Sequence, residues 1–123
     1  MSEVLSFRAA GRSDVGLVRE NNEDSGLIGK HFLLVADGMG GHAAGELASA
    51  TAVAMLAELD ANPPSEPVTA LNDVVERIAG TLVEMVQEDE EVQGMGTTVT
   101  CIYWTGDRMA IVHVGDSRAY LLR

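Results

Sequence analysis

A continuous apolar segment that ends in an acidic, glycine-rich turn constrains the fold of this chain more than any other feature. Residues 32–36 are Phe-Leu-Leu-Val-Ala, an uninterrupted run expected of a strand that is buried on both faces. The turn Asp37-Gly38-Met39-Gly40-Gly41 breaks the run, and strong helix formers rich in alanine follow over residues 43–59. The pattern predicts a buried strand, a tight turn and a helix, with Asp37 held at the edge of a sheet.

The rest of the chain predicts one more helix and several strands. The second helix is expected to begin near Pro67, because proline suits the first helical turn. Its apolar residues recur with a helical period, at Leu71, Val74, Val75, Ile78, Leu82, Met85 and Val86. Strand-like composition predicts extended segments at 5–10, 15–18, 25–28, 31–36, 97–104, 108–114 and 119–123. Two helices with about six to seven strands indicate the α+β class.

The acidic composition limits the classes of partner. The 19 Asp and Glu residues against 8 Lys and Arg give a formal charge of −11. Nucleic acid and anionic membrane surfaces both attract cationic side chains, so neither is an expected partner. Hard divalent cations prefer carboxylate oxygen, so the charge is compatible with a metal site, although simple solubility would also account for it.

The chain shows no sign of an oxidising compartment or a membrane. Cys101 is its only cysteine, so one chain forms neither a disulfide nor a thiolate metal site. Residues 1–12 lack the apolar core of a signal peptide, and no apolar run approaches the ~20 residues that span a bilayer. The sequence therefore predicts a cytoplasmic protein.

Asp37 is the strongest candidate for a metal ligand. Gly38 offers a backbone carbonyl that could ligate a hard cation beside this carboxylate, and the glycines allow another group to approach closely. An Asp-Gly pair is by itself more often an ordinary turn, but the buried strand and the long glycine-rich stretch favour a functional carboxylate. No dinucleotide fingerprint or phosphate-loop Lys-Ser/Thr follows, so a nucleotide site is not expected.

A second acidic pair, Glu23-Asp24, precedes a predicted strand. Adjacent side chains of an extended chain point to opposite sides, so one of the pair can face a site while the other does not. Arg19 lies just before them, and its planar guanidinium is suited to bind the oxygens of a phosphate bidentately. Taken singly, each of these residues would be read as an ordinary surface charge.

Asp116 repeats the pattern of Asp37, because the apolar residues 111–114 also end in Gly-Asp. Two strand-end carboxylates could converge on one cation site, and a turn aspartate is the alternative interpretation. His42 follows the glycine-rich turn, where its ring could donate a proton or hydrogen-bond to a metal-bound water. These residues together favour an acidic metal site with an arginine nearby, which suits two-metal hydrolytic chemistry.

Four segments, in this order, resemble successive motifs of bacterial type-2C protein phosphatases over nearly the whole chain. They are residues 19–24 (Arg-Glu-Asn-Asn-Glu-Asp), 37–42 (Asp-Gly-Met-Gly-Gly-His), 94–98 (Gly-Met-Gly-Thr-Thr) and 115–118 (Gly-Asp-Ser-Arg). The resemblance implies a β-sandwich with flanking helices, of which residues 1–123 would form the N-terminal part of one catalytic domain.

The resemblance also implies a binuclear Mn²⁺ or Mg²⁺ centre, with a third and more loosely held ion in bacterial members. By analogy, Asp37 would bridge two ions and the Gly38 carbonyl would ligate one of them. Glu23 and Asp24 would hold metal-bound waters or touch the ions. Asp116 would ligate the third ion.

The implied reaction is the direct attack of a metal-activated water on phosphoserine or phosphothreonine, without a phosphoenzyme. Arg19 would hold the substrate phosphate, and His42 would lie near it at the substrate-binding side. The implied partners are proteins phosphorylated by serine/threonine kinases.

The chain also departs from the family pattern. The later Asp-Gly and Gly-x-x-Asp-Asn-type segments and the flap region do not occur in it. The resemblance therefore implies a domain truncated before its C-terminal metal ligands, with weaker cation binding and with exposed sheet edges that favour self-association. The alternative hypothesis is a catalytically silent fragment that acts as a binding or self-assembling module.

Overall fold

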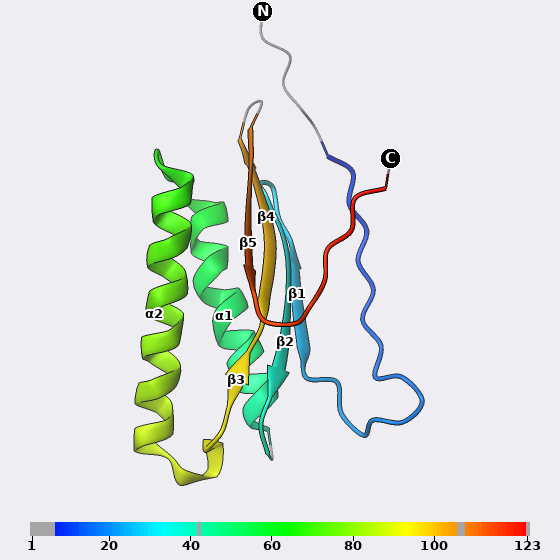
Figure 1. The fold of residues 1–123 in the computed structure, drawn as a ribbon, viewed down its shortest axis with the longest axis vertical. Coiled ribbons are helices and arrows are strands. Elements are labelled where there is room, and N and C mark those ends of the chain that lie inside the picture. The colour runs from blue at the N-terminus through cyan, green and yellow to red at the C-terminus, as the bar shows by residue number, and fades with distance from the viewer. Residues whose placement is uncertain (1–6, 42, 106–107, 123) are drawn as a thin grey trace, which may run out of the picture.

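The computed structural model describes residues 7–41, 43–105 and 108–122, which form one antiparallel sheet with two helices on one face (Figure 1). The strands are β1 (Asp24–Ile28), β2 (Phe32–Met39), β3 (Gly96–Thr97), β4 (Val99–Thr105) and β5 (Arg108–Val114). The helices are α1 (Ala44–Ala61) and α2 (Pro67–Glu88), followed by the short 3₁₀ helix η1 (Glu90–Val92). The predicted α+β class and both predicted helices are confirmed.

The sheet has the strand order β1-β2-β4-β5, and β3 pairs with the end of β2. β1 and β2 form a hairpin whose turn contains Gly29-Lys30, between the extended segments predicted at 25–28 and 31–36. The Asp60 carboxylate of α1 accepts hydrogen bonds from the amides of Lys30 and His31, at 3.0 and 2.6 Å. This contact ties the hairpin turn to α1 at the end of the sheet opposite the glycine-rich turn.

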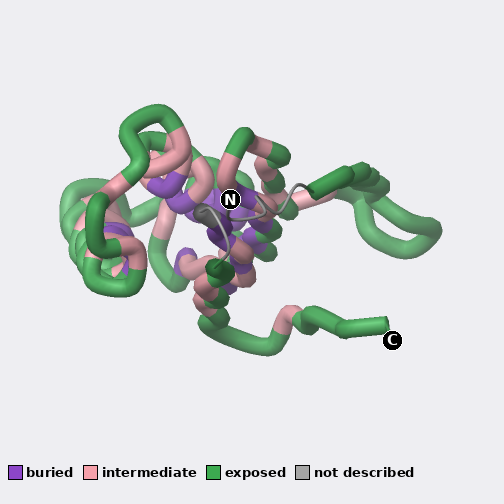
Figure 2. Tube along the Cα trace, turned by 90° about the horizontal axis from the view of Figure 1, so that it is seen from above, coloured by how far each residue is buried: buried purple, intermediate pink, exposed green. Residues whose placement is uncertain are grey.

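The hydrophobic core lies between the sheet and the helices, where the buried residues gather (Figure 2). Alternate residues of β2 point into it, so Phe32 and Leu34 are buried. α1 comes close to the sheet because its contact residues Ala48 and Ala52 are small. The apolar stripe predicted for α2 buries Leu71, Val74 and Ile78. Each fully buried aliphatic side chain contributes about 1.5–3 kcal/mol to the hydrophobic driving force.

The opposite face of the sheet carries no helix in the described residues. Val35 of β2 and Ile111 of β5 are 54% and 62% exposed there. The prediction that residues 32–36 form a strand buried on both faces is therefore wrong for one face in this structure. An uninterrupted apolar run indicates that both faces can be covered, and here the helices cover only one of them.

Three segments with strand-like composition form no strand: residues 7–10, 15–18 and 119–122. The described residues therefore contain five strands rather than six to seven. These segments run beside the uncovered face of the sheet as exposed chain (Figure 1). Composition alone does not make a strand, because a partner must satisfy its N–H and C=O groups. Residues 5–6 and 123 of these predictions lie outside the described residues.

α2 is the longest of the described helices, with 22 residues, and its exposed side carries charged residues such as Asp73 and Glu76. None of the helices in the described residues combines the length and hydrophobicity that crossing a membrane requires.

Shortening a core side chain of α1 is expected to destabilise the fold strongly. Leu56 is fully buried, so Leu56→Ala leaves a cavity and should lower the free energy of unfolding by about 2–5 kcal/mol. Val68 of α2 is exposed, and Val68→Ala should change it by less than about 0.5 kcal/mol. Urea unfolding followed by circular dichroism measures both values, and equal losses would contradict the assigned core.

Candidate metal centre

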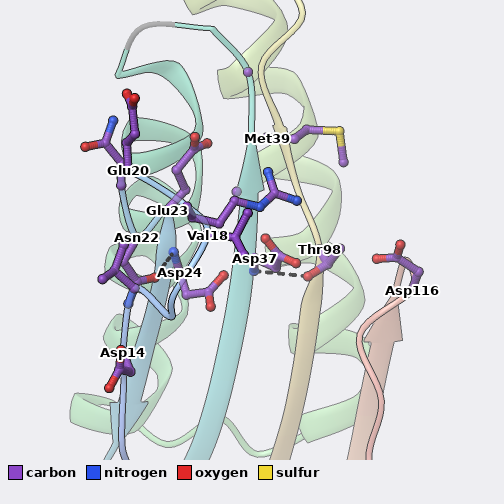
Figure 3. Close-up of a pocket in the computed structure, with 15 residues that line it drawn as sticks. Asp14, Val18, Glu20, Asn22, Glu23, Asp24, Asp37, Met39, Thr98 and Asp116 are labelled. Carbon is purple, nitrogen blue, oxygen red and sulfur yellow. Dashed lines mark hydrogen bonds between the residues drawn. The ribbon is translucent and has the colours of Figure 1, made fainter.

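The register of β1 against β2 places two carboxylates side by side. Asp24, the first residue of β1, is the partner of Asp37 in β2. Residues directly opposite in an antiparallel pair project from the same face, with Cβ atoms about 4.5–5.5 Å apart. Ala36 is buried against the helices, and neighbouring residues of a strand point to opposite faces. Asp37, and Asp24 beside it, therefore lie on the face opposite the helices (Figure 3).

The same row continues across the sheet to a third carboxylate. β2 keeps one register against β3 and β4, which places Asp37 opposite Thr98. The β4–β5 register places Gly115 beside Thr98 in turn, and Asp116 follows directly. Figure 3 shows Asp24, Asp37, Thr98 and Asp116 in this order. The sheet therefore gathers at one end acidic residues that are far apart in the sequence.

A pocket of about 730 Å³ lies over this row. It is lined by Asp14, Val15, Val18, Arg19, Glu20, Asn21, Asn22, Glu23, Asp24, Asp37, Gly38, Met39, Gly40, Thr98 and Asp116. Six of these side chains are carboxylates and one is a guanidinium, so the local field attracts cations.

Six of the seven residues predicted for the site line this pocket: Arg19, Glu23, Asp24, Asp37, Gly38 and Asp116. The seventh, His42, lies outside the described residues. Among the residues that the structure describes, no three acidic, histidine or cysteine side chains are grouped closely enough to hold one ion. The structure thus brings the predicted residues to one pocket, while their roles as ligands stay predictions.

A buried hydroxyl of α1 anchors the segment that carries Glu23 and Asp24. Ser49 Oγ donates to the Glu23 carbonyl at 2.7 Å and lies 2.9 Å from Ser25 Oγ. The amide of Gly38 donates to the same carbonyl at 3.2 Å. The Glu23 carbonyl therefore links α1, β2 and the segment that leads into β1. These hydrogen bonds fix the position of Glu23 and Asp24 relative to the sheet.

α1 begins in backbone contact with the end of β2. A β-carbon on Gly38 would collide with the Gly45 carbonyl, and a β-carbon on Gly45 would collide with the Glu23 carboxylate. Glycine permits this close approach because it has no side chain. The sequence pattern did not single out Gly45 or Ser49, and Thr98 was included only as the last residue of the 94–98 motif, without a role of its own. The signal available in the sequence was Gly45 itself, because a glycine inside a predicted helix often marks a place where another element packs closely.

The proximity of the carboxylates changes the proton affinity of Asp24. Partial burial raises the pKa of its carboxyl above the ordinary value of 3.8, and the hydrogen bond and charge of Asp37, then the charge of Glu23, raise that pKa further. In the described residues the one ion pair joins Arg12 and Asp14, so no basic side chain is ion-paired with Asp24. Neighbouring carboxylates without an ion-paired base offer the oxygen ligands that hard divalent cations prefer.

Residues 5–123 match the family model described as Protein phosphatase 2C. The chain belongs to the protein phosphatase 2C family. The resemblance seen in its four motifs is thereby confirmed.

Named phosphatases are similar to this phosphatase 2C chain. It is 49% identical over 121 residues to the serine/threonine protein phosphatase PstP of Mycobacterium tuberculosis. The matched region covers 98% of this chain and 24% of PstP. It is 35% identical over 122 residues to the serine/threonine phosphatase stp of Listeria monocytogenes. That matched region covers 91% of this chain and 48% of stp.

The same similarity extends to solved structures. The crystal structure of the PstP catalytic domain in complex with two manganese ions matches with a TM-score of 0.86 and 49% identity, over 91% of this chain and 49% of that chain. The phosphatase 2C chain thus has the fold of the N-terminal portion of such a domain. It spans about a quarter to a half of the relatives that it matches.

Removing the Asp24 charge is expected to flatten the pH dependence of stability in the metal-free phosphatase 2C chain. The folded-state pKa of Asp24 lies above 3.8, so the folded state keeps this proton to a higher pH than the unfolded state. The contribution of Asp24 to the free energy of unfolding therefore falls as pH rises from about 4 through the raised pKa. Asp24→Asn has no such proton to lose.

Urea unfolding in the presence of EDTA, from about pH 4 to about pH 7, measures this difference. Asp73→Asn is the matched control, because Asp73 is exposed on α2 and should keep the wild-type slope. An Asp24→Asn slope equal to that of the wild type would contradict the paired arrangement of Asp24 and Asp37.

Gly38→Ala is expected to disturb the site by overpacking. The new methyl group would collide with the main-chain carbonyl of Gly45, which cannot move without shifting α1, so the free energy of unfolding should fall by about 1–3 kcal/mol. Gly80→Ala in α2 is the control, since open space surrounds that position and the change should stabilise by about 0.4–1 kcal/mol. Thermal unfolding of both variants tests the contact, and a neutral Gly38→Ala would disprove it.

Proposed function

We propose that this phosphatase 2C chain supplies the phosphate-binding arginine and metal-binding carboxylates of a metal-dependent serine/threonine protein phosphatase. The observation that carries the proposal is the convergence of Arg19, Glu23, Asp24, Asp37 and Asp116 on one acidic pocket. The similar proteins are named serine/threonine phosphatases, which supports extending that activity to this chain. In this proposal residues 1–123 are the N-terminal part of one catalytic domain.

The proposed cofactor is Mn²⁺ or Mg²⁺, because oxygen ligands suit both ions. The two manganese ions in the similar PstP structure favour a binuclear centre. Asp37 would be shared by two ions, with Glu23, Asp24 and the Gly38 carbonyl completing this side. Asp116 lies across the next strand from Asp37, which suits a separate third ion. When bound, such cations lower the pKa of the attacking water and neutralise the phosphoryl charge.

Arg19 is proposed to bind the substrate phosphate. It lines the same pocket as the carboxylates, and no ion pair engages its guanidinium in the described part of the chain. A free guanidinium beside bound cations can hold two oxygens of a phosphate dianion and orient the phosphorus toward the metal side. His42 is proposed as a second substrate contact, from its position after the glycine-rich turn.

Direct attack by water is the proposed reaction, and phosphoserine and phosphothreonine in proteins are the proposed substrates. Cys101 does not offer a competing thiolate nucleophile. It is buried on the helix-covered face, and burial raises the pKa of its thiol to about 11. The thiol therefore stays protonated at neutral pH. It lies away from the row of residues Asp24, Asp37, Thr98 and Asp116, which we call the acidic row.

The uncovered face of the sheet favours a second candidate function, that of a silent module which binds another chain or itself. Val35, Met109 and Ile111 expose apolar surface on this face, and β1 and β5 are edge strands of the described sheet. Apolar surface and unpaired strand edges both promote association. This candidate needs no metal chemistry.

Asp37→Asn tests the proposed function most simply in the phosphatase 2C chain itself. The variant loses the central carboxylate, so its Mn²⁺ affinity should fall by at least about tenfold and its hydrolysis of a phosphothreonine peptide should disappear. Glu84→Gln, on the exposed side of α2, is the control and should leave both unchanged. Isothermal titration measures the affinity, and phosphate release measures the hydrolysis.

The wild-type chain separates the two candidate functions in the same experiment. Mn²⁺ binding with hydrolysis supports the phosphatase. Binding without hydrolysis favours the silent module. A wild-type chain that binds no Mn²⁺ would contradict the metal centre.

A further inference from the structure

Thr98 is one of two polar residues that are buried in the described part of the chain, and it lies within the acidic row. It is 4% exposed, and the other buried polar residue is Ser49. Most buried hydroxyl groups in native structures have hydrogen-bond partners. Both partners of Thr98 belong to the segments that carry proposed metal ligands.

On one side Thr98 holds the main chain of Asp37. Its amide donates to the Asp37 carbonyl at 2.9 Å, as expected for residues opposite each other in an antiparallel pair. The return hydrogen bond differs, because the Asp37 amide donates to Thr98 Oγ1 at 3.0 Å instead of to the main-chain carbonyl. The position of the Asp37 peptide therefore depends on a side-chain hydroxyl.

On the other side the same hydroxyl contacts the turn that carries Asp116. Thr98 Oγ1 and Ser117 Oγ lie 2.8 Å apart. A hydroxyl has one proton and two lone pairs, so Oγ1 can accept from Asp37 and still hydrogen-bond to Ser117. One oxygen atom thus connects the backbone of Asp37 to the residue after Asp116.

The methyl group of Thr98 supports the same turn. Gly115 has a φ of +101°, and a β-carbon on it would lie 2.6 Å from Thr98 Cγ2. The turn therefore runs in close contact with this methyl, in a backbone conformation that favours glycine. Thr98 uses both branches of its side chain at the site.

We propose that Thr98 is a positioning residue that fixes the separation of Asp37 and Asp116, the two carboxylates that would hold cations on either side of it. This inference rests on the proposed metal-dependent function. Thr98 itself contributes no carboxylate, and it acts through the Asp37 peptide and the Ser117 hydroxyl.

The competing interpretation is a structural one, in which Thr98 only bridges the gap between β3 and β4. The two interpretations differ in what the loss of the hydroxyl changes. A structural role lowers stability and leaves metal binding in the folded chain unaltered. A positioning role weakens metal binding in chains that are still folded.

Chemical-shift changes of amide signals on titration with Mg²⁺, in an isotope-labelled chain, separate these roles residue by residue. In the wild type, the amides around Asp37 and Asp116 should shift over one range of Mg²⁺ concentration. Thr98→Val keeps the shape and the methyl group but loses the hydroxyl, and should need about tenfold more Mg²⁺ at both carboxylates. Thr98→Ser keeps the hydroxyl and should restore most of the response.

Ser117→Ala is the second variant, since it removes only one side of the bridge at a partly exposed position. It should weaken the Mg²⁺-dependent shifts around Asp116 and leave those around Asp37 unchanged. Thr81→Val in α2 is the matched control, because the Thr81 hydroxyl bonds only to its own helix, at Arg77. It should behave as the wild type does.

Each outcome decides between the interpretations. Wild-type shifts in both Thr98→Val and Ser117→Ala would overturn the positioning role while leaving the metal centre intact. If Thr98→Val does not fold, a selective loss of shifts around Asp116 in Ser117→Ala supports the proposal and its absence overturns it. A wild-type chain whose amides at these carboxylates do not respond to Mg²⁺ would remove the proposed function, and the role of Thr98 with it.

Discussion

The register between neighbouring strands, at the end of the sheet that carries Asp37, is the constraint on which the rest of this phosphatase 2C chain depends. It sets Asp24 beside Asp37, Asp37 beside Thr98, and Thr98 beside Gly115, just before Asp116. A slip of one residue in any pairing would turn the shifted side chains to the face that the helices cover. The acidic pocket is therefore a consequence of strand pairing, and the hydrogen bonds of Thr98 join its two sides.

α1 holds this register in place from the covered face. At one end of the sheet Asp60 accepts two amides of the hairpin turn. At the other end Gly45 packs against Gly38, and the Ser49 hydroxyl binds the Glu23 carbonyl. Small residues along the helix keep the backbones close, so the distance between helix and sheet is fixed by backbone contact rather than by adaptable side chains. Such a support suits a site in which like charges repel one another.

The sequence predicted the residues whose chemistry is distinctive and missed those whose role is geometric. Asp37 and Asp116 stood out because each ends an apolar strand, and Arg19 stood out because a guanidinium suits phosphate. Ser49 was not noticed, and Thr98 was noticed only as part of the 94–98 motif. Both carry ordinary hydroxyls, whose roles appear only when strand pairing and helix packing set their partners. The two helices followed from composition and periodicity. The extended segments at 15–18 and 119–122 were mispredicted as strands because pairing partners are not encoded locally.

We propose that the acidic row binds divalent cations on the uncovered face of the sheet. The most direct measurement is an anomalous difference map at the manganese absorption edge, from crystals of this chain grown with Mn²⁺. We expect anomalous density within ligand distance of the Asp37 carboxylate, on the side shared with Asp24. Manganese found only at other acidic positions, such as the run Glu88-Asp89-Glu90-Glu91 at the end of α2, with none at Asp37, would contradict this proposal.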